Sequence, residues 1–479
     1  MRRRVIATPR SAWADPADVF SELCRGDGPA FWLDSGVSAT TGWSYLGVAS
    51  RTVTASIADG TATEQPSGSV TRGTIFDFLR AQHSPGLDER TDPDAVWGPF
   101  RLGWVGWLGY ELHAQTMATG LARPSRHPDA ALMFVERAWA FDHATRTVTQ
   151  LTLEPAPSTR WLSALELGAK VISGLRSDAS ADARPGRRLS GARVPATWAY
   201  PDHDYLAMIE SCQLSIAAGD AYQLCLTTQV HVDAHPDPVD TYLRLRELSP
   251  SHHGGFVRIG GVSLLSSSPE QFLTVSAPSR PAGRVIESKP IKGTRRRGAT
   301  PEEDAALRDE LLASEKERAE NLMIVDLMRN DIGRVSEVGT VTVPSLLEVE
   351  TYAQVHQLVS TVRGVLAEGL DPVDAVAACF PAGSMTGAPK RAAIPLLDAL
   401  EQRPRGIYSG AFGYFGLDGR IELAMVIRSI ILDVDGATIG TGGGITAPSV
   451  PREELEEVKV KAAALLRVLG AASHESLIW

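Results

Sequence analysis

Residues 421–445 predict a pair of antiparallel strands, and this pairing restricts the fold more than any other segment. The segment reads IELAMVIRSIILDVDGATIGTGGGI. Its apolar and β-branched content favours strands, and the dipeptide Asp435–Gly436 is typical of a tight hairpin turn. Antiparallel strands joined by a short turn favour an α+β or all-β fold over a parallel α/β fold.

Arg428 is a charged residue inside the first of these predicted strands. With a period of two, one face of the strand carries Ala424, Val426, Arg428 and Ile430. A charge on a buried face needs a partner, which is either a protein carboxylate or a ligand carboxylate held by two hydrogen bonds. The glycines at 441–445 follow the second strand without a helix after them, which argues against a dinucleotide-binding loop. They form either a tight turn or a place where backbone N–H groups approach an anion.

Two helices are predicted downstream of residue 299. The first begins with Thr300 as N-cap, Pro301 and Glu303, a capping-box pattern, and continues to about residue 335 as one helix or as two broken near Ser314. The last begins at Pro451 and ends at Gly470. Its apolar stripe consists of Leu455, Val458, Ala462, Leu465 and Leu469.

Each helix carries two glutamates three residues apart, which places each pair on one helical face. The pairs are Glu317 with Glu320 and Glu454 with Glu457. Four carboxylates from two helices could surround Mg²⁺, which prefers oxygen ligands. From the residues alone, two solvated faces with ordinary salt bridges are the commoner outcome. Lys461, one turn after Glu457, either pairs with it or meets a ligand anion.

Composition excludes several classes of protein. The 479 residues contain 47 Lys+Arg and 57 Asp+Glu, a net charge of -10, which argues against general nucleic-acid binding. The four cysteines form no CxxC pair, and so few cysteines in so long a chain suit a reducing compartment. Residues 1–16 have no apolar core of a secretory signal, and no apolar run is long enough to span a membrane. We therefore expect a cytoplasmic protein.

The chain divides into three regions by composition. Residues 1–175 are expected to form an N-terminal region of strands and short helices. Residues 176–197 are rich in Ala, Arg, Ser, Pro and Gly and are predicted to be an exposed linker. Residues 198–475 have more regular patterns and are predicted to be the main domain.

Four further features could carry chemistry. Glu270 follows a proline in SSSPEQF, His356 lies among apolar residues, and residues 380–390 form a loop rich in Gly, Pro, Ser and Thr. A lone glutamate is usually at the surface, and a histidine among apolar residues is usually part of the core. Residues 287–298, ESKPIKGTRRRG, form either a basic patch for a polyanion or the setting of one chemically active lysine.

These segments together resemble the chorismate-utilising enzymes. The motifs SPEQF, PIKGTRRRG, ENLMIVDLMRNDIGRV, VHQLVST, FPAGSMTGAPK, YSGAFGYFG, MVIRS and EELEEVKVK occur in that family's order. The resemblance covers roughly residues 200–470 and includes the anthranilate, aminodeoxychorismate, isochorismate and salicylate synthases. It implies an α+β fold of two large antiparallel β-sheets packed against each other and flanked by helices, with the site between them.

The resemblance also implies roles for individual residues. Glu320 and Glu457 would bind Mg²⁺ directly, with Glu317 and Glu454 nearby or acting through water, and the metal would hold the ring carboxylate of chorismate. Glu270 would be the general acid that protonates the departing 4-hydroxyl. His356 would lie close to the ring. The other end of the substrate would be held by Arg428, Tyr408, Ser384, Thr294, Lys461 and the backbone of Gly443 and Gly444.

Lys292 points to one branch of the family. Anthranilate synthases typically carry Ala here, whereas aminodeoxychorismate synthases carry Pro-Ile-Lys-Gly-Thr, as in residues 290–294. In that branch the lysine is a nucleophile, so it must be neutral, and we expect burial and the nearby basic residues to lower its pKa. Gln223 stands where isochorismate and salicylate synthases place a water-activating lysine, which favours ammonia over water.

Some positions depart from the family pattern, and alternatives stay open. Arg296 replaces a frequent Pro, Cys225 replaces a frequent Asn, and residues 32–35, WLDS, replace the Leu-Leu-Glu-Ser that anthranilate synthases use for tryptophan feedback. Anthranilate synthase component I is the main alternative. Less favoured alternatives are an isochorismate or salicylate synthase, and a non-catalytic protein that binds a polyanion through residues 289–297. With no amidotransferase segment recognised, we expect ammonia from a separate glutamine amidotransferase subunit, and neither nucleic acid nor membrane as a partner.

Overall fold

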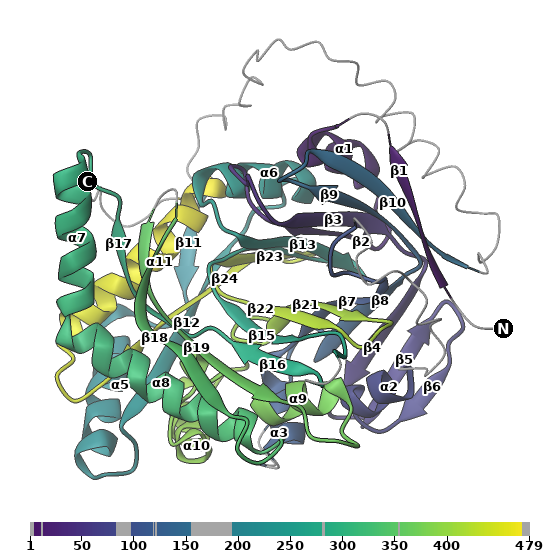
Figure 1. Ribbon diagram of the computed structural model, residues 1–479. Helices are drawn as coiled ribbons and strands as arrows, with labels where there is room; N and C mark the ends of the chain where they lie inside the picture. The colour runs from purple at the N-terminus through teal and green to yellow at the C-terminus, as the bar shows by residue number, and fades with distance from the viewer. Residues whose placement is uncertain are drawn as a thin grey trace.

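Two large antiparallel sheets face each other, and helices surround them (Figure 1). The computed structural model describes residues 4–10, 13–82, 97–117, 119, 122–154, 194–279, 283–352 and 355–471. The largest hydrophobic cluster joins side chains from both sheets. The sheets approach closely at Gly255, where an added Cβ would overlap the ring of Phe412 in the other sheet. The predicted fold of two packed antiparallel sheets flanked by helices is confirmed.

The first sheet combines strands from the beginning, middle and end of the chain. Its order is β1 (Arg4–Arg10), β10 (Thr147–Glu154), β9 (Arg137–Asp142), β3 (Trp43–Val48), β2 (Ala30–Asp34), β13 (His253–Ile259), β14 (Val262–Ser268), β23 (Ser429–Asp433), β24 (Gly436–Ile445), β12 (Gln223–Val232) and β11 (Ala196–Trp198), with β20 (Gly387–Ala388) beside β12.

The second sheet is built in the same way. Its order is β17 (Ile291–Arg296), β19 (Val355–Val365), β16 (Val285–Ser288), β15 (Gln271–Val275), β22 (Ile421–Met425), β21 (Ala411–Gly416), β7 (Gly103–Leu108), β8 (Ala130–Val135), β4 (Arg51–Ser56), β5 (Thr61–Gln65) and β6 (Val70–Arg72), with β18 (Thr342–Thr351) beside β19.

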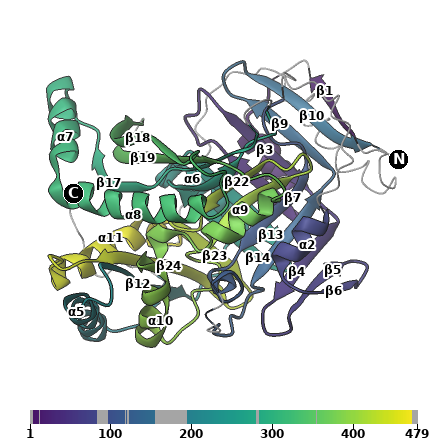
Figure 2. The same ribbon diagram turned by 60° about the horizontal axis from the view of Figure 1, so that its bottom comes forward.

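Helices cover the outer faces of the sheets and one end of the molecule. They are α1 (Pro16–Leu23), α2 (Ile75–Gln82), α3 (His113–Thr116), α5 (Asp202–Ala217), α6 (Pro238–Leu248), α7 (Pro301–Ala313), α8 (Glu315–Gly333), α9 (Pro372–Cys379), α10 (Lys390–Glu401) and α11 (Pro451–Val468), with short 3-10 turns η1 (Tyr110–Leu112) and η3 (Gly383–Met385). Figure 2 shows α7, α8 and α11 at the same end of the molecule. No helix in the described part of the chain is long and apolar enough to cross a membrane.

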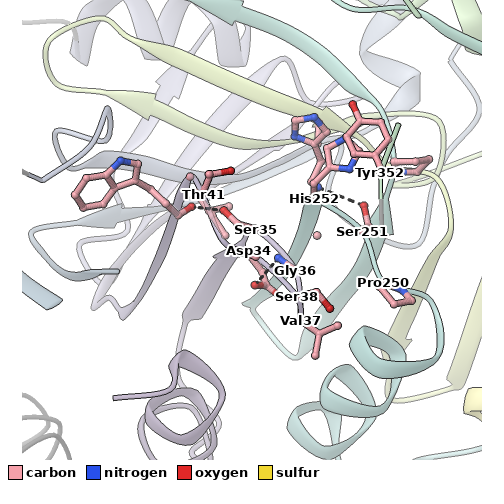
Figure 3. Close-up of a pocket in the computed structure, with 18 of the residues that line it drawn as sticks. Asp34, Ser35, Gly36, Val37, Ser38, Thr41, Pro250, Ser251, His252 and Tyr352 are labelled. Atoms are coloured by element: carbon pink, nitrogen blue, oxygen red, sulfur yellow. Dashed lines mark hydrogen bonds between the residues drawn. The ribbon is translucent and has the colours of Figure 1, made fainter. Parts of the chain in front are cut away.

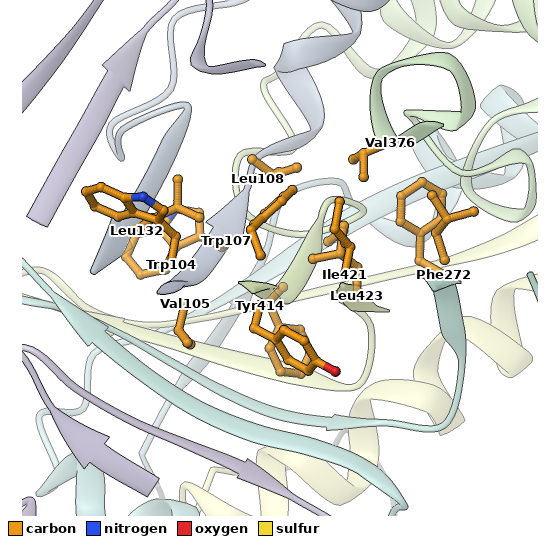
Figure 4. Close-up of a cluster of buried hydrophobic side chains, with 14 of the residues drawn as sticks. Trp104, Val105, Trp107, Leu108, Leu132, Phe272, Val376, Tyr414, Ile421 and Leu423 are labelled. Carbon is orange, nitrogen blue, oxygen red and sulfur yellow. The ribbon is translucent and has the colours of Figure 1, made fainter. Parts of the chain in front are cut away.

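The middle of the second sheet is buried on both faces. All six residues of β7 are buried, and its side chains meet those of β8, β21 and β22, while Val376 of α9 packs nearby (Figure 4). The Gly-rich aromatic segment at 102–112 therefore contains a central strand followed by η1. Burial of large aromatic side chains here holds the strands that carry the site in place.

The hairpin predicted at 421–445 is present, but its first strand is divided. β23 and β24 pair antiparallel, with Asp433 opposite Gly436. β22 belongs to the second sheet and β23 to the first, and Arg428 lies between them with φ 50°. The prediction that Arg428 shares a strand face with Ala424 was therefore wrong. The chain crosses between sheets at this point, and the change of direction breaks the period of two.

The two predicted helices are confirmed in more detail. Ser314 ends α7 and caps α8, so the first helix is two helices broken at that residue. The Thr300 side chain accepts from Glu303 N, but the Glu303 carboxylate accepts from Ala299 N instead of completing the capping box. The predicted apolar stripe of α11 is buried throughout.

The two predicted regions on either side of the linker share both sheets. β2 pairs with β13, and β7 pairs with β21. Residues 176–193 of the predicted linker lie outside the described residues, and Ala196–Trp198 form β11. The boundaries 1–175, 176–197 and 198–475 stay predictions about sequence regions, because neighbouring strands come from both sides of the linker.

Candidate active site

One cavity of about 420 Å³ collects almost all the predicted site residues. Residues of α8, α11, β17, β24 and η3 line it. The predicted residues that line it are Glu270, Lys292, Thr294, Glu317, Glu320, Ser384, Tyr408, Arg428, Gly443, Gly444, Glu454, Glu457 and Lys461. They come from segments that are distant in the sequence, so the antiparallel fold brings them together.

Lys292 lies inside this cavity with its ammonium group beside a carboxylate. Its Nζ is 3.6 Å from Oε2 of Glu320, and its side chain is 16% exposed. Burial acts to lower the pKa of Lys292, but Glu320 and the other acidic groups outweigh it and raise the pKa above its usual value. The expectation of a lowered pKa was wrong for this arrangement, because the near neighbours of Lys292 are acidic.

The other basic residues of segment 287–298 pair with acids. Arg295 Nη2 lies 2.9 Å from Glu310, Arg296 pairs with Glu303, and Arg297 Nη2 lies 2.7 Å from Asp304. These acids all belong to α7. Lys289 Nζ lies 3.2 Å from Glu350. The cluster therefore ties β17 to its neighbours and does not present an unpaired basic patch.

Glu270 is a buried carboxyl group in the loop between β14 and β15. Burial raises the pKa of Glu270 to about 7, while the charge of Lys292 and a hydrogen bond from Ser384 act in the opposite direction. A carboxyl group with this pKa holds a proton near neutral pH and can donate it to a leaving group. The position and the pKa of Glu270 both suit the predicted general acid.

Four glutamates from α8 and α11 line the cavity in addition to Glu270, and each of the four has a basic neighbour. Lys316 Nζ lies 3.4 Å from Glu454, Lys461 Nζ lies 2.7 Å from Glu457, and Arg295 Nη1 lies 3.6 Å from Glu317. With the carboxylates held by these cations, no group of three His, Cys, Asp or Glu side chains in the described residues is close enough to bind a metal.

The glutamates nevertheless suit a hard cation in chemistry and position. They supply carboxylate oxygens from both sides of one cavity, the donor type that Mg²⁺ prefers. Burial raises the pKa of Glu320, so a cation would relieve an existing cost of holding that carboxylate ionised. The Mg²⁺ site stays a prediction.

Arg428 and Tyr408 also line the cavity. Burial lowers the pKa of Arg428, and Tyr408 and Glu457 act against this. The Tyr408 ring lies on Gly440, where an added Cβ would overlap it. Gly443 and Gly444 belong to β24 and pair with β12, so the glycine run is part of a strand and neither a turn nor a loop.

His356 is the predicted site residue that the fold does not bring to the cavity. Its side chain is 1% exposed and makes hydrogen-bond contacts with Thr351 Oγ1 and Asp304 Oδ1, both at 2.9 Å. The adjacent residue, Gln357, lines the cavity instead. Neighbouring residues of a strand face opposite sides, so only one of the two can point inward.

Several other polar side chains in this region were not predicted as substrate-binding residues. Lys316 and Gln357 line the cavity, and their only sequence signal was proximity to Glu317 and His356. Gln223 is 1% exposed, and neither of its amide atoms has a hydrogen-bond partner in the described residues. An added Cβ on Gly444 would overlap the Gln223 amide, so this side chain lies at the cavity wall.

A second cavity, of about 700 Å³, is lined by Leu33, Asp34 and Ser35 of the WLDS segment (Figure 3). Ser35 Oγ donates to the carbonyl of Trp43 at 2.7 Å, and Asp34 accepts from Arg246 Nε at 2.5 Å. Pro269 and Gln357 line both this cavity and the one that holds Lys292. The two cavities therefore share a wall next to Glu270.

The fold and the cavity define a chorismate-binding enzyme, and the chain belongs to that family. The family model described as chorismate binding enzyme matches residues 28–467. This span includes all the residues predicted to form the site.

Individual relatives agree with this assignment. An aminodeoxychorismate synthase of Streptomyces griseus is 44% identical over 98% of this chain, which spans 65% of that relative's length. Anthranilate synthase component 1 of Streptomyces coelicolor is 35% identical over 95% of this chain and 87% of that protein. The crystal structure of anthranilate synthase component I from Streptococcus pneumoniae has a TM-score of 0.74 at 29% identity, covering 91% of this chain and 94% of that one.

Proposed function

We propose that this chain catalyses the Mg²⁺-dependent amination of chorismate by ammonia to 4-amino-4-deoxychorismate. The observation that carries the proposal is the presence of Lys292 and Glu270 in one cavity, where a nucleophile and a protonated acid can act on the same substrate. The similarity to an aminodeoxychorismate synthase supports it.

The reaction consists of two successive displacement steps at the ring of chorismate. Lys292, as the neutral amine, forms a bond to the ring while the C4–O bond breaks, and Glu270 gives its proton to the leaving hydroxyl so that water departs. Ammonia then forms the C4–N bond while the bond to Lys292 breaks. The proton released by the incoming ammonia returns to the Glu270 carboxylate.

The remaining residues bind and orient the substrate. Mg²⁺ held by Glu320 and Glu457, with Glu317 and Glu454 close by, would neutralise the ring carboxylate. Arg428 supplies a cation at the far end, since a guanidinium can hold a carboxylate by two hydrogen bonds. The predicted contacts of His356 are not part of this proposal, and Gln357 takes its place at the ring.

We further propose that a separate glutamine amidotransferase subunit supplies the ammonia, that the reaction takes place in the cytoplasm, and that the product enters the p-aminobenzoate route to folate. These assignments rest on the resemblance to the aminodeoxychorismate synthases. Copurification with an amidotransferase, and glutamine-dependent turnover of the pair, would test the first of them.

Product analysis tests the reaction. The purified chain would be incubated with chorismate, Mg²⁺ and ammonium at mildly alkaline pH, followed by mass spectrometry. An aminated product that keeps the enolpyruvyl group is expected. Anthranilate together with released pyruvate would instead identify the anthranilate synthase reaction, the activity named for the 35% identical relative. If neither product forms, both the proposed reaction and the anthranilate synthase reaction are refuted.

A further inference from the structure

Lys292 lies in a β-bulge of β17. The register of β17 against β19 shifts by one residue between Ile291 and Thr294, so Lys292 and Gly293 lie opposite the single residue Leu358. A bulge interrupts the regular ladder and re-aims a side chain. Here the re-aimed residue lines the catalytic cavity, as we call the cavity that holds Lys292 and Glu270. The bulge therefore accounts for the direction in which the proposed nucleophile points.

Gly293 allows the backbone to form this bulge beneath two helices. Its φ of 81° lies in the left-handed region, which glycine adopts without strain. An added Cβ on Gly293 would lie 2.7 Å from Leu311 Cδ1 and 2.9 Å from Glu317 Cδ. These side chains belong to α7 and α8, so both helices pack directly against the bulge.

The side chain of Asn321 connects the bulge to α8. Asn321 is completely buried. Its Nδ2 donates to the carbonyl of Leu358, opposite the bulge, at 3.2 Å, and to the carbonyl of Pro290, just before β17, at 3.4 Å. One amide group thus contacts the backbone on both strands that form the bulge.

Ser360 of β19 completes the hydrogen bonds of Asn321. Ser360 Oγ donates to Asn321 Oδ1 at 2.6 Å and accepts from Leu347 N at 2.9 Å. The Ser360 backbone N–H donates to the Pro290 carbonyl at 3.1 Å. A buried amide with both its nitrogen and its oxygen bonded is held in one orientation. The network therefore fixes the start of β17 against α8, β18 and β19.

Asn321 directly follows Glu320, the acidic partner of Lys292. Glu320 Oε2 lies 3.6 Å from Lys292 Nζ, whereas Asn321 holds the strand from which Lys292 projects. Two consecutive residues of α8 therefore contact the same part of β17, one at its backbone and the other at the ammonium group.

We propose that Asn321 is a positioning residue, which maintains the bulge in β17 and thereby directs Lys292 into the catalytic cavity. This inference rests on the proposed function of Lys292 as the nucleophile. Without the Asn321 amide, the carbonyls of Pro290 and Leu358 lose a buried donor, and this loss favours other pairings of the two strands. Loss of the bulge shifts the pairing by one residue, which moves a side chain to the other face of the sheet.

The variant Asn321→Leu tests the role of the amide, because leucine has a similar volume and no hydrogen-bonding group. The kcat for amination should fall about thirtyfold or more, since a misplaced nucleophile reacts slowly. The KM for chorismate should stay within about threefold of the parent value, because other residues bind the substrate.

Met328→Ala is the matched control for a general loss of stability. Met328 is buried on the same face of α8, about two turns after Asn321. This variant should lower the Tm, because it leaves a cavity in the core, but should keep the kcat of the folded enzyme within about threefold. An equal loss of kcat in Met328→Ala and Asn321→Leu would overturn the inference, and so would an unchanged kcat in Asn321→Leu.

Crystal structures of the parent and of Asn321→Leu give a readout that does not depend on activity. In the variant, Lys292 Nζ should lie beyond about 4 Å from the Glu320 carboxylate, outside the range of an ion pair. An unmoved Lys292 would overturn the inference even if kcat falls.

Two further outcomes are distinguishable. If Asn321→Leu does not fold, Ser360→Ala removes the hydroxyl bonded to Asn321 and should lower kcat about three- to tenfold, again with an unchanged KM for chorismate. An unchanged kcat in Ser360→Ala would then refute the inference. If the parent chain does not aminate chorismate, the proposed function is wrong, and the position of Lys292 in the two crystal structures alone decides whether Asn321 directs it.

Discussion

Lys292 Nζ and Glu320 Oε2 lie 3.6 Å apart, so the proposed nucleophile and a proposed metal ligand form one ion pair. The pair joins β17 to the first turns of α8. In this arrangement the lysine is held in its charged form, which cannot attack. The proposed attack by Lys292 would therefore require Glu320 to exchange Lys292 for another cationic partner, and this exchange would link the proposed substrate and metal binding to activation of the lysine.

Replacing Lys292 should abolish amination while replacing its neighbour should not. Lys292→Ala removes the proposed nucleophile, so turnover should fall at least about 100-fold. Lys289→Ala is the matched control because Lys289 pairs with Glu350 outside the catalytic cavity, and it should stay within about twofold of the parent. Turnover is measured as aminated product by mass spectrometry. Near-normal turnover in Lys292→Ala would rule out the nucleophile.

Replacing Glu457 should change the dependence of activity on Mg²⁺, whereas replacing Glu456 should not. Glu457 lines the cavity, whereas Glu456 on the same helix is exposed and lies 3.6 Å from Lys459. Glu457→Gln should raise the Mg²⁺ concentration for half-maximal activity about tenfold or more, and Glu456→Gln should not. Mg²⁺ should also raise the Tm of the parent more than that of Glu457→Gln, because a cation that binds the folded state stabilises it. Equal Mg²⁺ responses in all three chains would contradict the site.

The protonation of Glu270 should appear in both activity and stability. Its pKa is raised from 4.5 to about 7, so the proton needed for donation is lost as pH rises through about 7, and the amination rate limited by this acid should decline there. A raised pKa contributes stability below about pH 4.5 that is lost as pH rises through about 7.

Glu270→Gln should therefore lose activity but gain stability at high pH. Relative to the parent, its free energy of unfolding in urea should increase between pH 5 and pH 8, by about 1–3 kcal/mol. The physical reason is that the parent must bury a charge at pH 8 and the amide does not. A stability difference that is independent of pH would show that Glu270 is not buried as described.

Replacing His356 should affect stability, whereas replacing Gln357 should affect the KM for chorismate. His356 is buried against Asp304 and Thr351, so His356→Ala should cost about 1–3 kcal/mol of stability with little change in the KM for chorismate. Gln357 lines the cavity, and its buried Oε1 has no partner in the described residues. Gln357→Ala should raise the KM for chorismate about tenfold with little loss of stability. The reverse pattern would restore His356 as the substrate contact.

Arg405 should be important for the wall behind the catalytic cavity. It is 4% exposed and donates to Glu401, to the carbonyl of Met385 at 2.6 Å and to that of Cys225 at 2.9 Å. Arg405→Met leaves Glu401 buried without its cation, at an expected cost of about 3–5 kcal/mol in urea unfolding. Arg403→Met, an exposed neighbour, should change stability by less than about 0.5 kcal/mol. A small effect at Arg405 would contradict this role.

Local sequence patterns predicted several elements of the fold correctly. The hairpin of β23 and β24, the break at Ser314 and the buried stripe of α11 are as predicted, because turn chemistry, capping and periodicity act over a few residues. The two-residue turn lies one position earlier than predicted, at Val434 and Asp435, because Gly436 already pairs with Asp433. The ordered motifs identified the family, and all the predicted site residues except His356 line one cavity.

Contacts between segments distant in the sequence account for the differences between the predicted and the observed structure. Whether 421–433 is one strand, whether His356 or Gln357 faces the substrate, and which acids surround Lys292 all depend on segments distant in the chain. The residue types along the chain specify which groups can bind, donate a proton or attack. The partners of those groups come from the three-dimensional packing, because a side chain's pKa and accessibility are set by its neighbours, and these belong to both sheets and to α7, α8 and α11.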